Sequence, residues 1–117
     1  MCGIAVFFGS KDDPVYARRK RMIDCLHHRG PDAVGEHEIE LPNGRVLWLG
    51  HSRLSILDLS DAGRQPMTDL VTRNVVAYNG ELYNFRELAE NLKTKGVRLH
   101  SSGDTEVLLA AYRIWKK

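Results

Sequence analysis

The stretch that decides the fold is MCGIAVFF, residues 1–8. From Gly3 to Phe8 every residue is glycine or apolar, and the run stops at Gly9. An apolar run of this length that ends at a turn residue predicts a strand buried on both faces. Such a strand would hold the N-terminus inside a core and would keep Cys2, the residue at its start, from fraying.

Cys2 becomes the N-terminal residue once the initiator Met1 is removed, and a small second side chain such as cysteine permits that removal. The mature chain would then carry a thiol and a free α-amine on one residue. A thiolate is the strongest common side-chain nucleophile, and an α-amine with a pKa of roughly 7.7–8.0 can accept the thiol proton near neutral pH. The alternative is that Cys2 is a chance neighbour of the start codon, because so short a motif often arises by accident.

The composition favours one globular domain of ordinary size. The chain has 117 residues, of which 43% are hydrophobic, and its net charge of +2 argues neither for nor against an acidic partner. No apolar run has the length of a membrane span. Cys2 and Cys25 lack the spacing of a disulfide or metal framework, so we expect a cytoplasmic protein. The basic residues 18–21 wrap around a predicted helix, which disfavours a nucleic-acid-binding stripe.

The rest of the chain alternates predicted strands and helices, without repeats or linkers. Asn84 and Glu87 match a capping box at the start of a helix that ends at Gly96. A first helix is predicted from Asp13-Pro14 to before Gly30, followed by a hairpin of residues 36–41 and 45–50 and by strands at 74–78 and 97–99. A last helix starts within 101–106. Its apolar side carries Val107, Leu108, Ala111, Tyr112 and Trp115.

Polar residues at the ends of predicted elements are candidates for a binding site. Arg53 leaves a buried segment and is suited to hold a carboxylate through two parallel hydrogen bonds, with a structural salt bridge as the alternative. Asn79 and Gly80 end a strand, where a side-chain amide and a glycine N–H can donate to an oxyanion, although a plain Asn-Gly turn is common. Asp104 is either a helix N-cap or a pocket carboxylate that pairs with an ammonium group.

Five short motifs follow one another along the chain: MCGI at 1–4, HRGPD at 28–32, GHSRLSI at 50–56, NGELYN at 79–84 and SGDTE at 102–106. Together they resemble the N-terminal glutaminase domain of the class II glutamine amidotransferases, in particular the asparagine synthetase type. The resemblance implies an α+β fold, the four-layer α-β-β-α sandwich of the N-terminal-nucleophile hydrolases. Residues 1–117 would form the N-terminal part of a glutamine amidotransferase type-2 domain, with the sandwich incomplete at its C-terminal end.

The resemblance also implies a role for each candidate residue. Cys2 would attack the side-chain amide of glutamine, and the Asn79 side chain and the Gly80 N–H would hold the oxyanion. Arg53 would bind the substrate α-carboxylate. The other substrate-binding positions are two acids that would hold the α-ammonium group and a backbone stretch that would line the pocket: Asp104, Glu81, Leu54, Ser55, Ile56 and Leu57.

The resemblance implies that this chain uses no metal and no organic cofactor. ATP and Mg²⁺ would belong to a synthetase domain, whose Ser-Gly-Gly-x-Asp-Ser loop does not occur in residues 1–117. The implied partners are glutamine as substrate and a synthetase domain or subunit that accepts ammonia, with a homodimer as an option and with no nucleic acid or membrane. The alternative function is a truncated, non-catalytic module that binds glutamine or docks to a partner.

Overall fold

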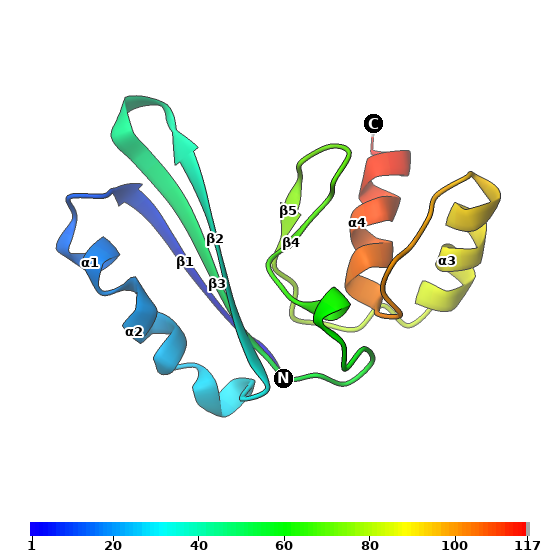
Figure 1. Ribbon diagram of the computed structural model, residues 1–117, viewed down its shortest axis with the longest axis horizontal. Coiled ribbons are helices and arrows are strands. Elements are labelled where there is room, and N and C mark those ends of the chain that lie inside the picture. The colour runs from blue at the N-terminus through cyan, green and yellow to red at the C-terminus, as the bar shows by residue number, and fades with distance from the viewer. Residues whose placement is uncertain (117) are drawn as a thin grey trace.

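The computed structural model describes residues 1–116 and combines helices and strands in an α+β fold (Figure 1). Three strands form an antiparallel sheet in the spatial order β1-β3-β2, and two short strands, β4 and β5, form a separate antiparallel pair. The strands are β1 (Gly3–Ser10), β2 (Ala33–Leu41), β3 (Arg45–Arg53), β4 (Met67–Thr68) and β5 (Val75–Val76).

The helices lie at the two outer sides of the molecule. Across Figure 1, α1 and α2 are followed by the three-stranded sheet, then by the β4–β5 pair, and then by α4 and α3. The helices are α1 (Pro14–Ala17), α2 (Arg19–Asp24), α3 (Phe85–Thr94) and α4 (Asp104–Trp115), with 3-10 turns at His27–Arg29, Pro42–Gly44 and Asp61–Gly63.

The first helix begins as predicted but is shorter. The Asp13 side chain accepts a hydrogen bond of 2.7 Å from the Val15 N–H, and Pro14 occupies the first turn, as expected of an N-cap followed by proline. The expected single helix is divided at Arg18 into α1 and α2, and the segment before Gly30 is a 3-10 turn. The predicted hairpin and its turn are present, but β2 begins three residues earlier, at Ala33, and β3 ends three residues later, at Arg53.

The register of the three-stranded sheet fixes the position of the N-terminus. Gly3 of β1 pairs with Ser52 near the end of β3. In an antiparallel pair the residue before Gly3 lies beside the residues that follow Ser52. Cys2 is therefore placed next to Arg53 and Leu54, although Leu54 lies 52 residues further along the chain.

One hydrophobic core lies between the three-stranded sheet and the first two helices. Its buried residues are Ala5 and Phe7 of β1, Val46 and Trp48 of β3, and Ile23 of α2. These strand residues alternate along the sequence, so that they share one face of the sheet. The β1 strand is thereby held on a packed layer, which gives Cys2 a rigid support.

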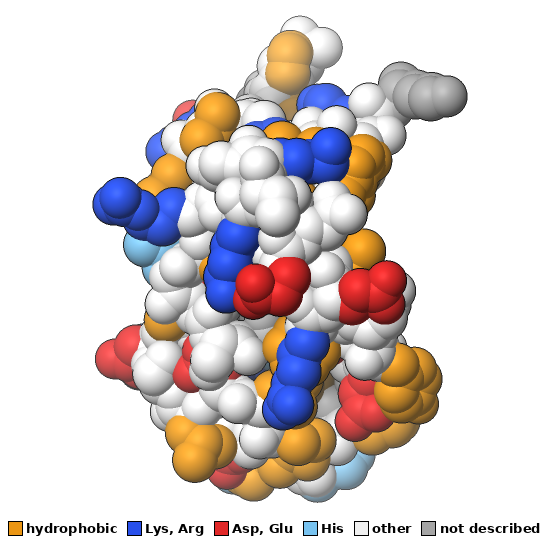
Figure 2. Space-filling model, turned by 90° about the vertical axis from the view of Figure 1, so that its right-hand side faces the viewer, with side chains coloured by type: hydrophobic (Ala, Val, Ile, Leu, Met, Phe, Trp, Pro, Cys, Tyr) orange, Lys and Arg blue, Asp and Glu red, His pale blue; other side chains and the backbone are white. Residues whose placement is uncertain are grey.

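A second core lies between α3 and α4. Its buried residues and the partly buried hydrophobic residues around them are Leu92, Val97, Val107, Ala110, Leu82, Phe85, Leu88, Ala89, Leu99 and Ala111. The opposite face of α3 is polar, and Glu90 and Lys93 form an exposed ion pair of 2.7 Å on it. Figure 2 shows this side of the molecule, where basic and acidic side chains are interspersed. The pattern is that of an amphipathic surface helix.

The prediction that the first strand is buried on both faces is wrong for the described residues. Ile4, Val6 and Phe8 are 36%, 51% and 59% exposed. The helices α1 and α2 cover only the face that carries Ala5 and Phe7. A continuous apolar run shows that both faces are suited to burial, but it does not show that both are covered.

Four local expectations also differ from the structure. Among residues 1–116 the Asn84 side chain makes no capping hydrogen bond, and its backbone, with φ −93° and ψ 22°, lies outside the extended region typical of an N-cap. Residues 97–99 have no strand partner, so Val97 packs in the second core as a loop residue. Val107 of α4 is buried as expected, but Tyr112 and Trp115 are 57% and 42% exposed, and the helix buries Leu109 and Ala110 in their place. The strand expected at residues 74–78 is reduced to β5, whose residues are only partly buried.

We expect Leu92→Ala to lower the free energy of unfolding by about 2–5 kcal/mol, because Leu92 is fully buried and its truncation leaves a cavity between α3 and α4. Leu70→Ala is the matched control, since Leu70 is 77% exposed. Urea denaturation followed by circular dichroism measures both changes. Equal midpoints for the two variants would contradict the proposed second core.

Candidate functional site

A cavity of about 350 Å³ lies where the ends of several elements meet, and its volume is within the range of small-molecule sites, roughly 300–1,000 Å³. Cys2 contributes from the start of β1, and Arg53 from the end of β3. Tyr78 comes from the segment after β5, and Asp104 is the first residue of α4. In Figure 1 the start of β1 and the end of β3 lie at the point marked N, and the start of α4 lies to the right of it. The cavity is therefore built from four parts of the chain.

The Cys2 thiol lies against the backbone of Leu54. The Leu54 N–H donates to Sγ at 3.4 Å, and Sγ lies 3.7 Å from the Leu54 carbonyl oxygen. The Arg29 Nε donates to the Cys2 carbonyl at 3.2 Å. These contacts hold the sulfur on the cavity wall beside the backbone of Leu54.

The motif at residues 28–32 supports this wall. Gly30 packs closely on β3. A Cβ atom at this position would lie 2.3 Å from the Ser52 carbonyl oxygen, so glycine is the residue that fits here without a clash. The Ser52 hydroxyl donates to the Gly30 carbonyl at 2.6 Å. The Asp32 carboxylate accepts the Ser55 N–H at 2.7 Å. The motif therefore connects β1, β3 and the loop that follows β3.

Arg53 is 8% exposed, and backbone carbonyl groups hold its guanidinium. It donates to the carbonyl of Ser60 at 3.0 Å and to the carbonyl of Asp58. Within residues 1–116 it forms no ion pair with an acidic side chain, so the salt-bridge alternative for Arg53 is not realised there. A buried cation with only neutral partners favours the approach of an anion from the cavity.

Asp104 is the first residue of α4 and not its N-cap, which is Gly103. Its carboxylate is 7% exposed, lines the cavity, and accepts the Leu82 N–H at 2.9 Å. Burial raises the pKa of the Tyr78 phenol, and the neighbouring carboxylates of Asp104 and Glu81 raise it further. The wall that carries Asp104 and Glu81 is therefore negatively charged, and it can pair with a cation.

Asn79 and Gly80 lie on the cavity wall directly after a firmly held residue. The Tyr78 N–H donates to the Gln65 side-chain oxygen at 2.5 Å, and the Tyr78 carbonyl lies 3.3 Å from the His51 Nε2. Gln65 is itself held, since its amide nitrogen donates to the Thr105 hydroxyl at 3.1 Å. These buried contacts fix the peptide that precedes Asn79.

Of the residues predicted for the site, the structure brings all but Ser55 to the cavity. The Ser55 N–H is turned toward Asp32. The cavity residues among the predicted ones are Cys2, Arg53, Leu54, Ile56, Leu57, Asn79, Gly80, Glu81 and Asp104. Sequence reasoning missed Asp58, Gln65 and Tyr78, which also line it. Gln65 stands before Pro66 in a stretch that resembles an ordinary loop, so no local pattern indicates its role.

The fold and the cavity together define a class of protein: an α+β domain whose small-molecule site joins a cysteine thiol, a buried cation and acidic side chains. Among the described residues, no group of three or more metal-ligating side chains is gathered in one place. None of the helices in the described part of the chain has the length and apolar character needed to cross a bilayer.

The comparison with known proteins shows which family this is. The profile of a glutamine amidotransferase domain matches residues 1–117, and the chain belongs to this family. It is 36% identical to asparagine synthetase [glutamine-hydrolyzing] 3 of Bacillus subtilis (strain 168) over 124 residues, which is 100% of the chain and 19% of the relative. The corresponding asparagine synthetase 1 of Bacillus subtilis is 40% identical over 84% of the chain and 15% of its own length.

A plant protein gives a similar match. The asparagine synthetase [glutamine-hydrolyzing] of Brassica oleracea is 38% identical over 96% of the chain and 18% of its own length. The chain thus spans less than a fifth of each of these three relatives. The domain that it matches is one part of a much longer protein in each case.

We expect the stability of the chain to fall on acidification through His51. This side chain is fully buried, and its burial lowers the pKa below the ordinary value of 6.5. Because Tyr78 offers a carbonyl, Nε2 carries the proton, and Nδ1 has no hydrogen-bond partner among residues 1–116. Below about pH 6.5 the unfolded chain binds a proton that the folded chain does not, so the free energy of unfolding decreases as the pH falls toward the folded-state pKa.

The His51→Gln variant isolates this effect, since its side-chain amide can still donate to the Tyr78 carbonyl. Urea unfolding of both proteins between about pH 7.5 and 5.5, a range that brackets the ordinary histidine pKa, gives the difference in free energy. We expect the free energy of unfolding of the wild type to decrease more than that of His51→Gln as the pH is lowered. Parallel curves would show that His51 is not buried in its neutral form.

Proposed function

We propose that the chain hydrolyses the side-chain amide of glutamine to glutamate and ammonia. The observation that carries the proposal is that Cys2, Arg53, Asn79 and Asp104 line one cavity. Glutamine has a complementary group for each of them: an amide carbon for the thiol, an α-carboxylate for the guanidinium, an amide oxygen for the side-chain amide, and an α-ammonium group for the carboxylate. Membership of the glutamine amidotransferase domain family supports this substrate.

The two ends of the substrate would be held by opposite charges. Arg53 would bind the α-carboxylate, where a buried guanidinium gives a strong, charge-assisted hydrogen bond. Asp104 and Glu81 would bind the α-ammonium group on the acidic wall. The backbone of residues 54–57 would line the channel between them. With its α-carbon fixed in this way, glutamine would present its side-chain amide to the thiol.

Cys2 would act as the nucleophile after removal of Met1, which is 71% exposed at the mouth of the cavity. The freed α-amine would accept the thiol proton, and the thiolate would attack the amide carbon. The Asn79 side chain and the Gly80 N–H would donate to the oxyanion, and one such donor typically contributes about 2.7–4 kcal/mol to transition-state stabilisation.

The proton held by the α-amine would then pass to the leaving nitrogen. The C–N bond would break to release ammonia, and a Cys2 thioester would remain. Water would attack the thioester and release glutamate together with the free thiol. These steps require no metal and no organic cofactor, but they require a reduced thiol, which supports a cytoplasmic location.

The ammonia would pass to an ATP-dependent synthetase domain or subunit. The relatives named above are asparagine synthetases in which the matched region is one part of a longer chain. We therefore propose asparagine formation as the use of the ammonia, with ATP and Mg²⁺ bound by the synthetase part.

The same comparison supports a proposal about the fold. In Figure 1 helices lie at the two outer sides and strands lie between them, and Val6 and Phe8 leave one face of the three-stranded sheet exposed. We propose that residues 1–117 form the N-terminal part of a glutamine amidotransferase type-2 domain. Additional strands would cover this apolar face in the complete sandwich, because an exposed face of this kind favours association.

We expect Cys2→Ala to lower glutamine hydrolysis by at least about a thousandfold, because the variant has no nucleophile to form the thioester. Glutamate release in an enzyme-coupled assay measures the loss. Binding of glutamine, followed by isothermal titration calorimetry, should persist, since Arg53 and Asp104 are unchanged.

Cys25→Ala is the matched control. Cys25 is the exposed free thiol at the end of α2, outside the cavity lining, so this variant should retain activity. A glutamine-mimicking diazoketone should add one label to Cys2 and none to Cys25 in an intact-mass spectrum with peptide mapping. Unchanged hydrolysis in Cys2→Ala would overturn the mechanism, and binding without turnover in the processed wild-type chain would favour a non-catalytic glutamine-binding module.

A further inference from the structure

The loop after β3 is organised by a carboxylate that the proposed reaction leaves without a role. The Asp58 side chain is buried, and its Oδ1 accepts hydrogen bonds from the N–H and the hydroxyl of Ser60 at 2.8 and 2.6 Å. The bond from the Ser60 hydroxyl, followed by a bond from the Ser102 N–H and that from the Ser60 N–H, lowers the pKa of Asp58 to about 2. The group is therefore an anion with fixed hydrogen-bond geometry near neutral pH.

The loop that contains Asp58 also holds the side chain of Arg53. The carbonyl groups of Asp58 and Ser60 accept the hydrogen bonds of the guanidinium. On the other side, Gly63 packs so closely that a Cβ there would lie 2.3 Å from the Arg53 Nη2. The carboxylate of Asp58 thus holds together the two carbonyl groups that set the direction of the Arg53 side chain.

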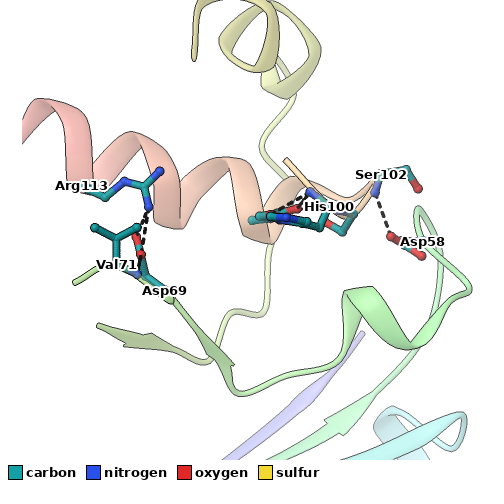
Figure 3. Close-up of polar contacts among 8 residues, drawn as sticks. Asp58, Asp69, Val71, His100, Ser102 and Arg113 are labelled. Atoms are coloured by element: carbon teal, nitrogen blue, oxygen red, sulfur yellow. Dashed lines mark hydrogen bonds and ion pairs between the residues drawn. The ribbon is translucent and has the colours of Figure 1, made fainter. Parts of the chain in front are cut away.

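The second oxygen of Asp58 extends to another part of the site. Oδ2 accepts the Ser102 N–H at 2.9 Å, and Figure 3 shows this bond between the loop after β3 and the segment that leads into α4. Ser102 stands two residues before Asp104. The carboxylate of Asp104 in turn accepts the Leu82 N–H at 2.9 Å. Asp58 therefore connects the loop of Arg53 to the helix start that carries Asp104.

We propose that Asp58 is a positioning residue that sets the separation between the α-carboxylate site at Arg53 and the α-ammonium site at Asp104. This inference rests on the proposed function, which assigns those two sites. Asp58 touches neither end of the substrate in this scheme. It acts through the backbone of Ser60 and Ser102, and it makes the cavity selective for ligands that carry both α-groups.

The test compares two ligands that differ only in the α-ammonium group, L-glutamate and glutarate. Asp58→Asn keeps the size of the side chain, but its NH₂ group cannot accept a hydrogen bond from Ser60 or Ser102. We expect the dissociation constant for glutamate to rise at least about tenfold, as for the loss of a charged hydrogen-bond acceptor, and that for glutarate to rise less than about threefold. Isothermal titration calorimetry on the 117-residue chain measures both constants.

Asp61→Asn is the matched control. Asp61 lies in the same loop, but its side chain is 87% exposed, and its ion-pair partner among residues 1–116 is Arg64, at 2.9 Å. This variant should bind both ligands as the wild type does. Ser60→Ala is a milder second variant if Asp58→Asn does not fold, because Asp58 then loses the hydroxyl donor but keeps its bonds from the N–H groups of Ser60 and Ser102. The same hydroxyl also accepts the Ala62 N–H at 3.2 Å. The Ser60→Ala variant should reduce the preference for glutamate in the same direction, by a smaller factor.

The outcomes separate this inference from the proposed function. An unchanged preference for glutamate over glutarate in Asp58→Asn, or in Ser60→Ala where only that variant folds, would overturn the inference. Equal weakening of both ligands would do the same, because it would indicate a general structural defect. If the wild-type chain prefers glutamate and Asp58→Asn loses this preference, the inference is supported. If the wild-type chain from which Met1 has been removed then releases no glutamate from glutamine, the proposed hydrolysis is overturned while the inference stands.

Discussion

The antiparallel pairing of β1 with β3 is the interaction on which the rest of the site depends. Because Gly3 pairs with Ser52, the thiol of Cys2 lies 3.4 Å from the Leu54 N–H. Gly30 packs closely on the end of β3, and Asp32, two residues further on, accepts the Ser55 N–H in the loop that follows β3. Motifs that are far apart in the sequence therefore meet because of one strand register, and a shift by one residue would turn every β1 side chain to the other face.

Short sequence patterns predicted the elements whose conformation depends on neighbouring residues, such as turns and hairpins. The β2–β3 hairpin was predictable because Asn43 and Gly44 accept positive φ angles of 66° and 69° at its turn. The first strand was predicted to be buried on both faces, but only one face is buried. An apolar run does not indicate which elements pack on each face. The gathering of Cys2, Arg53 and Asp104 at one cavity was expected from the resemblance of five motifs, since no single motif indicates it.

The contacts that position the site could not be predicted in the same way. Gln65 donates to Thr105 across 40 residues of sequence, and Asp58 accepts from Ser102 across 44. Each is a polar residue in a loop, where side chains normally face water. Gln65 and Asp58 are buried only because of the tertiary structure. Hydrophobic periodicity in the sequence predicts that such loop residues are exposed to solvent. Candidate catalytic and binding residues can be recognised in the sequence by their residue type. The residues that position them can be recognised only from their contacts in the structure.

The position of the cavity follows from how the two cores are joined. One core lies between the sheet and α2, and the other lies between α3 and α4, and they share no buried residue. Among the described residues, hydrogen bonds such as that between His51 and the Tyr78 carbonyl connect the two parts. An apolar junction would be close-packed and would fill the space between the cores. A junction of directional polar contacts leaves a cavity open between them, and it sets the geometry of the groups that line it.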